Sequence, residues 1–175
     1  MKNALTICVM VFTLCQSAQG GQIEISKSAG FLRVQIEKYP ENERRPLLDY
    51  LDKGRIAADN AVKLLTAGRM DEFIRDIVET SNSVEQQSKG ILDIYGSLIS
   101  SEYRGQALET EGDVHNLSKA FAATFYAIRS VKRPNEGLYL IIKTKTVDNE
   151  HRVFHAQFLE YVGDVPPWLL PQKKQ

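Results

Sequence analysis

The stretch Phe121–Val162, FAATFYAIRSVKRPNEGLYLIIKTKTVDNEHRVFHAQFLEYV, decides the fold, because it predicts three antiparallel strands joined by two short turns. Within residues 138–147, an apolar side alternates with a side that carries Tyr139, Lys143 and Lys145. Turn-forming residues at 133–136 and at 148–150 predict the two connections. The stretch therefore predicts an antiparallel sheet with one drier face.

The length of the second turn sets the register of the last two strands, because a slip by one residue moves every side chain to the opposite face. A three-residue turn over 148–150 sets Leu140 opposite Phe158 and Ile142 opposite Ala156, and we prefer it. The dry face under the helices is then predicted to contain Leu138, Leu140, Ile142, Phe154, Ala156 and Phe158, extended on the first strand by Phe121, Ala123, Phe125 and Ala127.

Two alternatives compete with this arrangement. A two-residue turn would place His155 on the dry side. The spacing of Leu117, Phe121, Phe125 and Ile128 also fits a helix, which competes with the start of the first strand.

Three helices are predicted before the sheet, at Pro46–Ala67, at Met70–Glu79 and from Ser83 to about Ser101. Gly68 is the expected C-terminal cap of the first helix. Gly54 within that helix predicts a kink or a close helix contact. The expected fold class is α+β, with N-terminal helices packed on a curved antiparallel sheet formed mainly by the C-terminal half.

Two segments have mixed patterns. Residues 22–45 fit a helical stripe, which we favour, although Leu32, Val34 and Ile36 alternate as a strand would. Tyr39-Pro40 should end any helix there. Residues 102–118 are predicted to form a loop with one short edge strand at 106–110.

The N-terminus predicts export. Lys2, a run of about a dozen apolar residues and small residues at Ala18 and Gly20 match a secretory signal peptide, and the run is too short to span a membrane. We divide the chain into a signal peptide (1–20), an N-terminal extension (21–45), an α+β domain (46–163) and a Pro-rich tail (164–175). Cys8 and Cys15 would be removed, which predicts a thiol-free bacterial protein that is periplasmic or secreted, without stable membrane insertion.

Charge and spacing argue against several classes of function. The 175 residues contain 22 Lys and Arg and 22 Asp and Glu, so there is no basic excess for a nucleic-acid partner. His151 and His155 would lie about 13 Å apart on one face of a strand, which is too far to share an ion. We expect no metal site and no cofactor.

A family resemblance rests on a run at the first helix junction, of the form A…A…LL..GR.D.F, made by Ala57, Ala61, Leu64, Leu65, Gly68, Arg69, Met70, Asp71 and Phe73. Together with residues 136–142 and the closing strand to Tyr161, it resembles the nuclear-transport-factor-2-like (cystatin-like) superfamily and its small exported bacterial domains of unknown function. The likeness covers roughly residues 46–162; it departs in the long third helix and in lacking the aromatic-glycine ending of the last strand. The resemblance implies a bent sheet wrapped on helices around a pocket. Some members are isomerases or dehydratases, and many only bind ligands or partners.

The candidate contact residues are Arg129, Lys143, His155, Gln157 and Trp168. Arg129 is the only charged member of the predicted dry face, whereas His155, Lys143 and Gln157 form a polar group on the other face, typical of a solvated sheet surface. Trp168 lies in the tail VPPWLLP, which we expect to fold back over the domain's own hydrophobic face rather than dock on a partner.

The function predicted from these features is that of an exported non-catalytic domain that binds an unknown protein or a small apolar ligand. The alternative is a small pocket enzyme of the isomerase or dehydratase type. That enzyme would need an acid and a phenol converging in the cone, and the predicted dry face carries no acid. A catalytic role is therefore the less favoured of the two.

Overall fold

The computed structural model describes residues 32–78, 82–110 and 116–161. Three helices, α1 (Glu41–Thr66), α2 (Met70–Asp76) and α3 (Asn82–Tyr95), precede most of the sheet. The strands are β1 (Leu32–Val34), β2 (Leu98–Thr110), β3 (Ala120–Ser130), β4 (Gly137–Val147) and β5 (Glu150–Tyr161), with short 3-10 helices at Ile36–Lys38 and Leu117–Lys119. The predicted α+β class, with N-terminal helices packed on the sheet, is confirmed.

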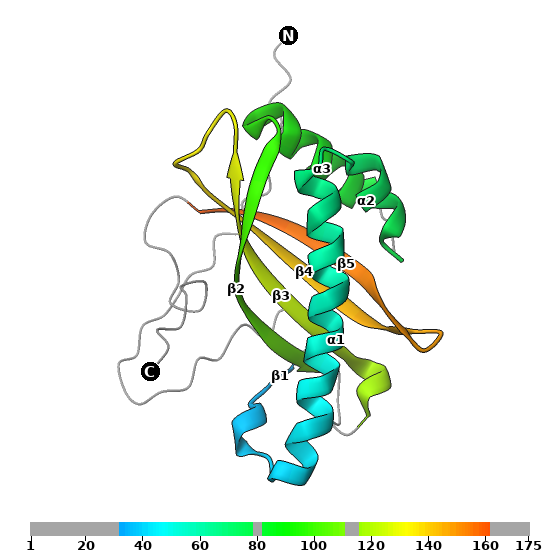
Figure 1. Cartoon of the computed structure of the whole chain (residues 1–175). Coiled ribbons are helices and arrows are strands. Elements are labelled where there is room, and N and C mark those ends of the chain that lie inside the picture. The colour runs from blue at the N-terminus through cyan, green and yellow to red at the C-terminus, as the bar shows by residue number, and fades with distance from the viewer. Residues whose placement is uncertain (1–31, 79–81, 111–115, 162–175) are drawn as a thin grey trace.

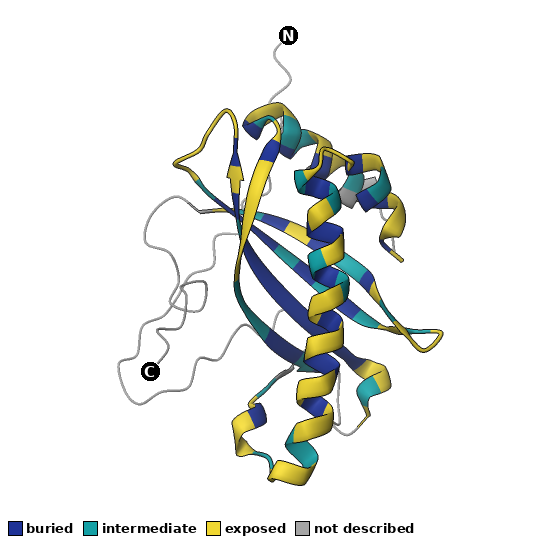
Figure 2. Ribbon diagram, viewed as in Figure 1, coloured by how far each residue is buried: buried dark blue, intermediate teal, exposed yellow. Residues whose placement is uncertain are grey.

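The sheet is an antiparallel meander in the order β1-β2-β3-β4-β5, and α1 crosses one side of it (Figure 1). We call that side the helix face and the opposite side the second face. Central strand β3 is buried along most of its length, while the outer side of α1 is exposed (Figure 2). No helix in the part of the chain that the structure describes is long and apolar enough to cross a membrane.

The helix boundaries differ from the prediction at three places. Helix α2 ends at Asp76 rather than at Glu79, because Ile77 is already extended. Helix α1 begins at Glu41, so that Pro46 lies inside it rather than at its start. Helix α3 ends at Tyr95 rather than near Ser101, because Gly96 adopts a φ of 72° and its N–H bonds the carbonyl of Leu92. The apolar spacing continues past Gly96, and for this reason it suggested a longer helix.

The segment predicted as a loop with a short strand is the long strand β2, which pairs with β3 from Leu98 to Thr110. Its side chains are mostly exposed at the start, so the apolar alternation that marks a strand is missing there. The pairing with a buried neighbour stabilises the strand instead. Residues 32–34 also form a strand, the alternative to the favoured helix, and the chain is extended at Tyr39 before Pro40, as predicted.

The predicted pairs in β4 and β5 are confirmed, although the turn is not the expected one. Leu140 pairs with Phe158 and Ile142 with Ala156, but the turn has two residues, because Val147 pairs with Glu150. A β-bulge restores the register: Lys143 pairs with His155 and Thr144 with Val153, so one residue is left over between them.

That extra residue is Phe154, and the bulge changes its face. Its ring lies 5.1 Å from that of Phe121, and the Lys145 ammonium lies 3.5 Å from its centroid. Phe154 therefore lies on the second face, and its predicted place under the helices was wrong.

The predicted side of β3 was also wrong. Tyr126 pairs with Leu140 and Ile128 with Leu138, and these four residues belong to one core cluster with the helices. Phe121, Ala123, Phe125 and Ala127 alternate with them and point to the second face. Both sides of β3 are buried and apolar, so the sequence pattern could not distinguish them.

Candidate ligand-binding groove

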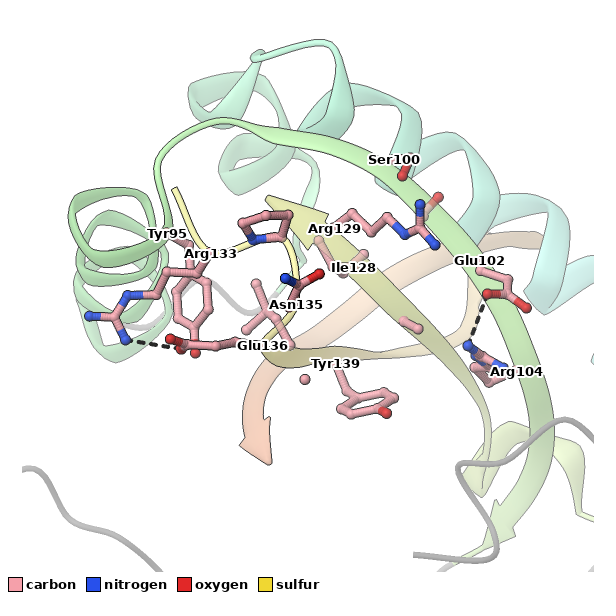
Figure 3. A pocket seen from close by; sticks show the side chains of 15 residues that line it. Tyr95, Ser100, Glu102, Arg104, Ile128, Arg129, Arg133, Asn135, Glu136 and Tyr139 are labelled. Atoms are coloured by element: carbon pink, nitrogen blue, oxygen red, sulfur yellow. Dashed lines mark hydrogen bonds and ion pairs between the residues drawn. The ribbon is translucent and has the colours of Figure 1, made fainter. Parts of the chain in front are cut away.

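A groove of about 840 Å³ lies at one end of the sheet, between β2, β3 and the turn that joins β3 to β4 (Figure 3). Ala127, Ile128, Leu138 and Tyr139 contribute its apolar lining, and Tyr139 is only 7% exposed. Its polar lining includes three arginines and two glutamates: Arg104, Arg129, Arg133, Glu102 and Glu136. The groove therefore combines an apolar surface with a small excess of positive charge.

Two of the three arginines have carboxylate partners. Arg104 Nη2 lies 2.9 Å from Glu102 Oε2, within β2. Arg133 Nη1 lies 2.9 Å from Glu136 Oε2, across the turn, and this carboxylate raises the pKa of Arg133 (Figure 3). Each of these positive charges is therefore largely balanced within the protein.

Arg129 differs from both. It is exposed near the end of β3, and no ion pair joins it to another residue of 32–78, 82–110 or 116–161. The backbone places it opposite Ser100 of β2, so that its side chain reaches the groove next to Glu102 (Figure 3). Arg129 is thus the lining cation that is available to an added anion.

Local backbone features position the arginines. The pairing of β2 with β3 shifts between Tyr103 and Gly105, which leaves Arg104 as the extra residue of a β-bulge. Gly105 has a φ of 147°, a conformation that side-chain-bearing residues rarely adopt. Arg104 Nε is buried and finds no acceptor in the described part of the chain. A bulge of this kind re-aims a side chain at the edge of a site.

Four of the five predicted contact residues share the second face. Lys143 and His155 are cross-strand partners, and Gln157 pairs with Ile141 on the same face as Arg129. The sequence prediction placed Arg129 on the helix face, because it assigned the two sides of β3 to the wrong faces of the sheet. Only Arg129 lines the groove. Trp168 lies outside the described residues.

Lys143 has a structural partner at the other end of this face. Its Nζ lies 2.6 Å from Glu109 Oε2, and both side chains are about one-fifth exposed. The pair bridges β2 and β4 above Ala123 of the intervening strand, whose small side chain leaves room for it. Lys143 therefore has a structural role, because its ion pair links β4 to β2.

His151 and His155 lie on opposite faces of the sheet, which corrects the predicted common face. The ring of His151 lies 4.4 Å from that of Tyr50 in α1, on the helix face. The bulge at Phe154 turns His155 to the second face. Among the residues that the structure describes, no group of three His, Cys, Asp or Glu side chains could hold a metal ion.

An acid and a phenol meet at a second place, between α1 and β3. Tyr126 donates a hydrogen bond of 2.6 Å to Asp59 Oδ1, and burial, then this carboxylate, raises the pKa of Tyr126. Arg55 lies 3.6 Å from Asp59 and 4.4 Å from the ring centroid of Tyr103. Tyr126 is only 2% exposed.

The sequence reasoning missed Glu102, Arg104 and Asp59. The first two lie in the segment predicted as a loop, so no face was assigned to them. Asp59 comes from helix α1, whereas the acid of a pocket enzyme was expected on the sheet face. The Arg55–Asp59 spacing of four residues was the one available signal, and such pairs are common on exposed helices.

Comparisons with known proteins identify no relative: no protein-family model, curated protein or solved structure matches this chain. The resemblance to the nuclear-transport-factor-2-like superfamily therefore stays a prediction.

Proposed function

We propose that the protein is a non-catalytic binding domain whose groove holds a small organic acid with an apolar body. The observation that carries the proposal is Arg129, an exposed guanidinium with no carboxylate partner among the described residues, in a groove where the other two arginines have partners. We further propose that it acts after export, as residues 1–20 predict.

The charge balance favours a ligand with one negative charge. A guanidinium binds a carboxylate through two parallel hydrogen bonds, and this geometry is stronger than that of a neutral pair. Glu102 and Glu136 would repel a second negative charge on the ligand, because they lie on either side of the groove.

The size and lining of the groove support the apolar part of the ligand. About 840 Å³ is in the range of pockets that hold small molecules. Ala127 and Tyr139, which lie on the same face as Arg129, contribute the apolar lining beside it. The partner expected from the sequence was an unknown protein or a small apolar ligand, and the proposal takes the small ligand and adds an acidic group to it.

The Asp59–Tyr126 pair is the observation that favours the alternative, a small pocket enzyme of the isomerase or dehydratase type. A substrate would have to touch the phenol, which is 2% exposed and already donates its proton to Asp59 in a hydrogen bond. This geometry supports a structural link between α1 and β3 instead.

The test uses octanoate and octanol as matched probes, because they share the apolar chain and differ in the carboxylate. We expect saturable octanoate binding by calorimetry, at least about tenfold tighter than octanol, which corresponds to one charge-assisted contact. Arg129→Gln should remove this preference. Arg45→Gln, which makes the same charge change on the exposed surface of α1, should keep it.

Equal binding of octanoate and octanol, or full octanoate binding by Arg129→Gln, would refute the proposed role of Arg129. Turnover of an isomerase or dehydratase substrate that disappears in Asp59→Asn would support the enzyme alternative. Mass spectrometry of exported protein should find a chain that starts at Gly21.

A further inference from the structure

Strand β2 lies at the edge of the sheet for most of its length. Among the residues that the structure describes, its outer side is paired only at Leu108–Thr110, where β1 lies beside it. We call the outer side of residues 98–107 the β2 edge. The side chains of residues 99–103 along it are exposed. An edge of this kind presents a row of backbone N–H and C=O groups with which another strand can pair.

The opposite edge of the sheet, formed by β5, is better protected. The N–H of Val78, which follows α2, donates a hydrogen bond of 2.8 Å to the carbonyl of Val153 in β5. Helix α3 contacts β5 as well. In the described part of the chain, no backbone hydrogen bond from outside the sheet reaches the β2 edge in the same way. The β2 edge is therefore the more accessible of the two.

The charged side chains on β2 favour one kind of partner. Glu102 and Arg104 flank Tyr103 and lie on the same face of the strand, where they form an ion pair of 2.9 Å. If two copies of this strand run antiparallel about Tyr103, Glu102 of one copy lies opposite Arg104 of the other, and the reverse pair forms as well. Opposite charges in cross-strand positions stabilise a sheet, whereas like charges destabilise it. The order of these residues is therefore complementary to itself.

We propose that two copies of the chain associate through the β2 edge, as antiparallel strands related by a two-fold axis at Tyr103. Tyr103 is the middle residue of 99–107, so this pairing ends at Ala107, directly before β1 pairs with Leu108. The two Tyr103 side chains, each 38% exposed in the single chain, then become a cross-strand aromatic pair. Arg129 takes no part, so the inference does not rest on the proposed function of the groove.

The self-complementary order also favours a second copy over an unrelated strand. A two-fold interface is formed by the same surface on both subunits, so each surface must complement itself. Residues 102–104 meet this condition only in the antiparallel direction, because a parallel pair in register would place Glu102 beside Glu102. An unrelated strand would need its own acid and base at matching positions. The length of the edge and its charges therefore agree on one partner and one direction.

Charge reversal tests the proposal. Sedimentation of the full chain between about 1 μM and about 1 mM should show a reversible equilibrium between monomer and dimer. Glu102→Arg and Arg104→Glu each place like charges opposite one another, and each should weaken the dimer at least about tenfold. Mixed in equal amounts, the two variants should form a heterodimer about as tight as the wild-type dimer. In that mixture every cross-strand pair again joins opposite charges.

Matched controls make the same charge changes elsewhere. Glu41→Arg and Arg45→Glu, at exposed positions of α1, should leave the dimer unchanged. Hydrogen exchange on the unmodified chain needs no variant: the amides of residues 99–107 should exchange several-fold more slowly at the highest concentration than at the lowest.

Three results would overturn the proposal. The first is a chain that stays monomeric up to about 1 mM. The second is a dimer that withstands both charge reversals or leaves the exchange of residues 99–107 unchanged, because it would then use another surface. The third is a mixture of natively folded Glu102→Arg and Arg104→Glu that associates no more tightly than either variant alone.

Discussion

Gly54 of α1 lies so close to Ala122 of β3 that a Cβ on Gly54 would overlap the Cβ of Ala122. The same atom would lie 2.6 Å from Thr144 Oγ1, in β4. Ala122 and Thr144 are a cross-strand pair, and both are 0% exposed. The missing side chain therefore allows the helix to rest directly on the sheet. Of the two alternatives predicted for Gly54, a kink or a close helix contact, this is a close contact, made with the sheet.

Gly54→Ala should destabilise the protein. Alanine gains up to about 1 kcal/mol in helix propensity over glycine, but overpacking of this kind costs typically about 1–3 kcal/mol, and here the clashing atoms belong to rigid strands. We expect a net loss of about 1–2 kcal/mol in the free energy of unfolding, measured with urea. Gly90→Ala in α3, where a Cβ meets nothing within 4 Å, should stabilise by roughly 0.5–1 kcal/mol. A gain in stability for both variants would contradict the close contact.

The Tyr126–Asp59 hydrogen bond should couple α1 to β3. Hydrogen bonds to charged groups contribute about 1.5–3 kcal/mol, and we expect Tyr126→Phe to lose an amount in the lower part of that range because Asp59 stays partly solvated. A double-mutant cycle with Asp59→Asn should give a coupling free energy of about 1 kcal/mol. Tyr103→Phe, whose hydroxyl lies 3.5 Å from Gln106, should change stability by less than about 0.5 kcal/mol. Additive effects of the two mutations at 126 and 59 would exclude the coupling.

The class of fold could be predicted from the sequence because its signals are local. The stripe that includes Leu47, Leu51, Ala58 and Val62 indicated α1, and the alternation in 138–147 indicated β4. The register of Leu140 and Ile142 was also correct. The turn that was thought to set it was not, because the bulge at Phe154 compensates for the shorter turn. Bulges depend on packing between strands and leave little trace in a single sequence.

The groove was less accessible to prediction for the same reason. Arg129 was identified, but the exchange of the two sides of β3 separated it from Lys143 and His155, which share its face. Periodicity cannot orient a strand that is apolar on both sides. The position of the Arg104 side chain depends on a bulge in β2, and the first half of β2 is exposed. Neither the bulge nor an exposed strand produces a recognisable pattern in the sequence.

The two-residue turn between β4 and β5 gives a further prediction. Asp148 and Asn149 have φ values of 51° and 66°, as a type I′ turn requires. Asn149→Ala should cost roughly 1 kcal/mol, because alanine avoids this conformation, and Asn149→Gly should be neutral or stabilising. Asn135→Ala is the control, since Asn135 lies in the other hairpin turn and has no positive φ. Thermal unfolding would measure all three, and equal changes for Ala at 149 and 135 would contradict the assigned turn.

His151 should make the stability depend on pH. Burial, reinforced by the charge of Lys53 and opposed by that of Asp49, lowers the pKa of His151 from its usual 6.5. The ring also contacts Tyr50, and its Nε2 lies 3.2 Å from Thr146 Oγ1. The folded protein therefore binds a proton at this site less readily than the unfolded chain.

The sign of the effect follows from that difference. Above the unfolded-state pKa of about 6.5 the ring is neutral in both the folded and the unfolded state, so it does not change the free energy of unfolding. Stability is lost as the pH falls from about 6.5 toward the lower pKa of the folded state. His151→Phe keeps an aromatic ring beside Tyr50 but cannot titrate. Urea unfolding between roughly pH 5 and pH 8 should show wild type losing stability relative to the variant only at the acid end. If the free energies of unfolding of wild type and His151→Phe differ by the same amount at every pH, His151 contributes packing alone. A titrating group with a lowered pKa must make the two stability curves diverge below its unfolded-state pKa.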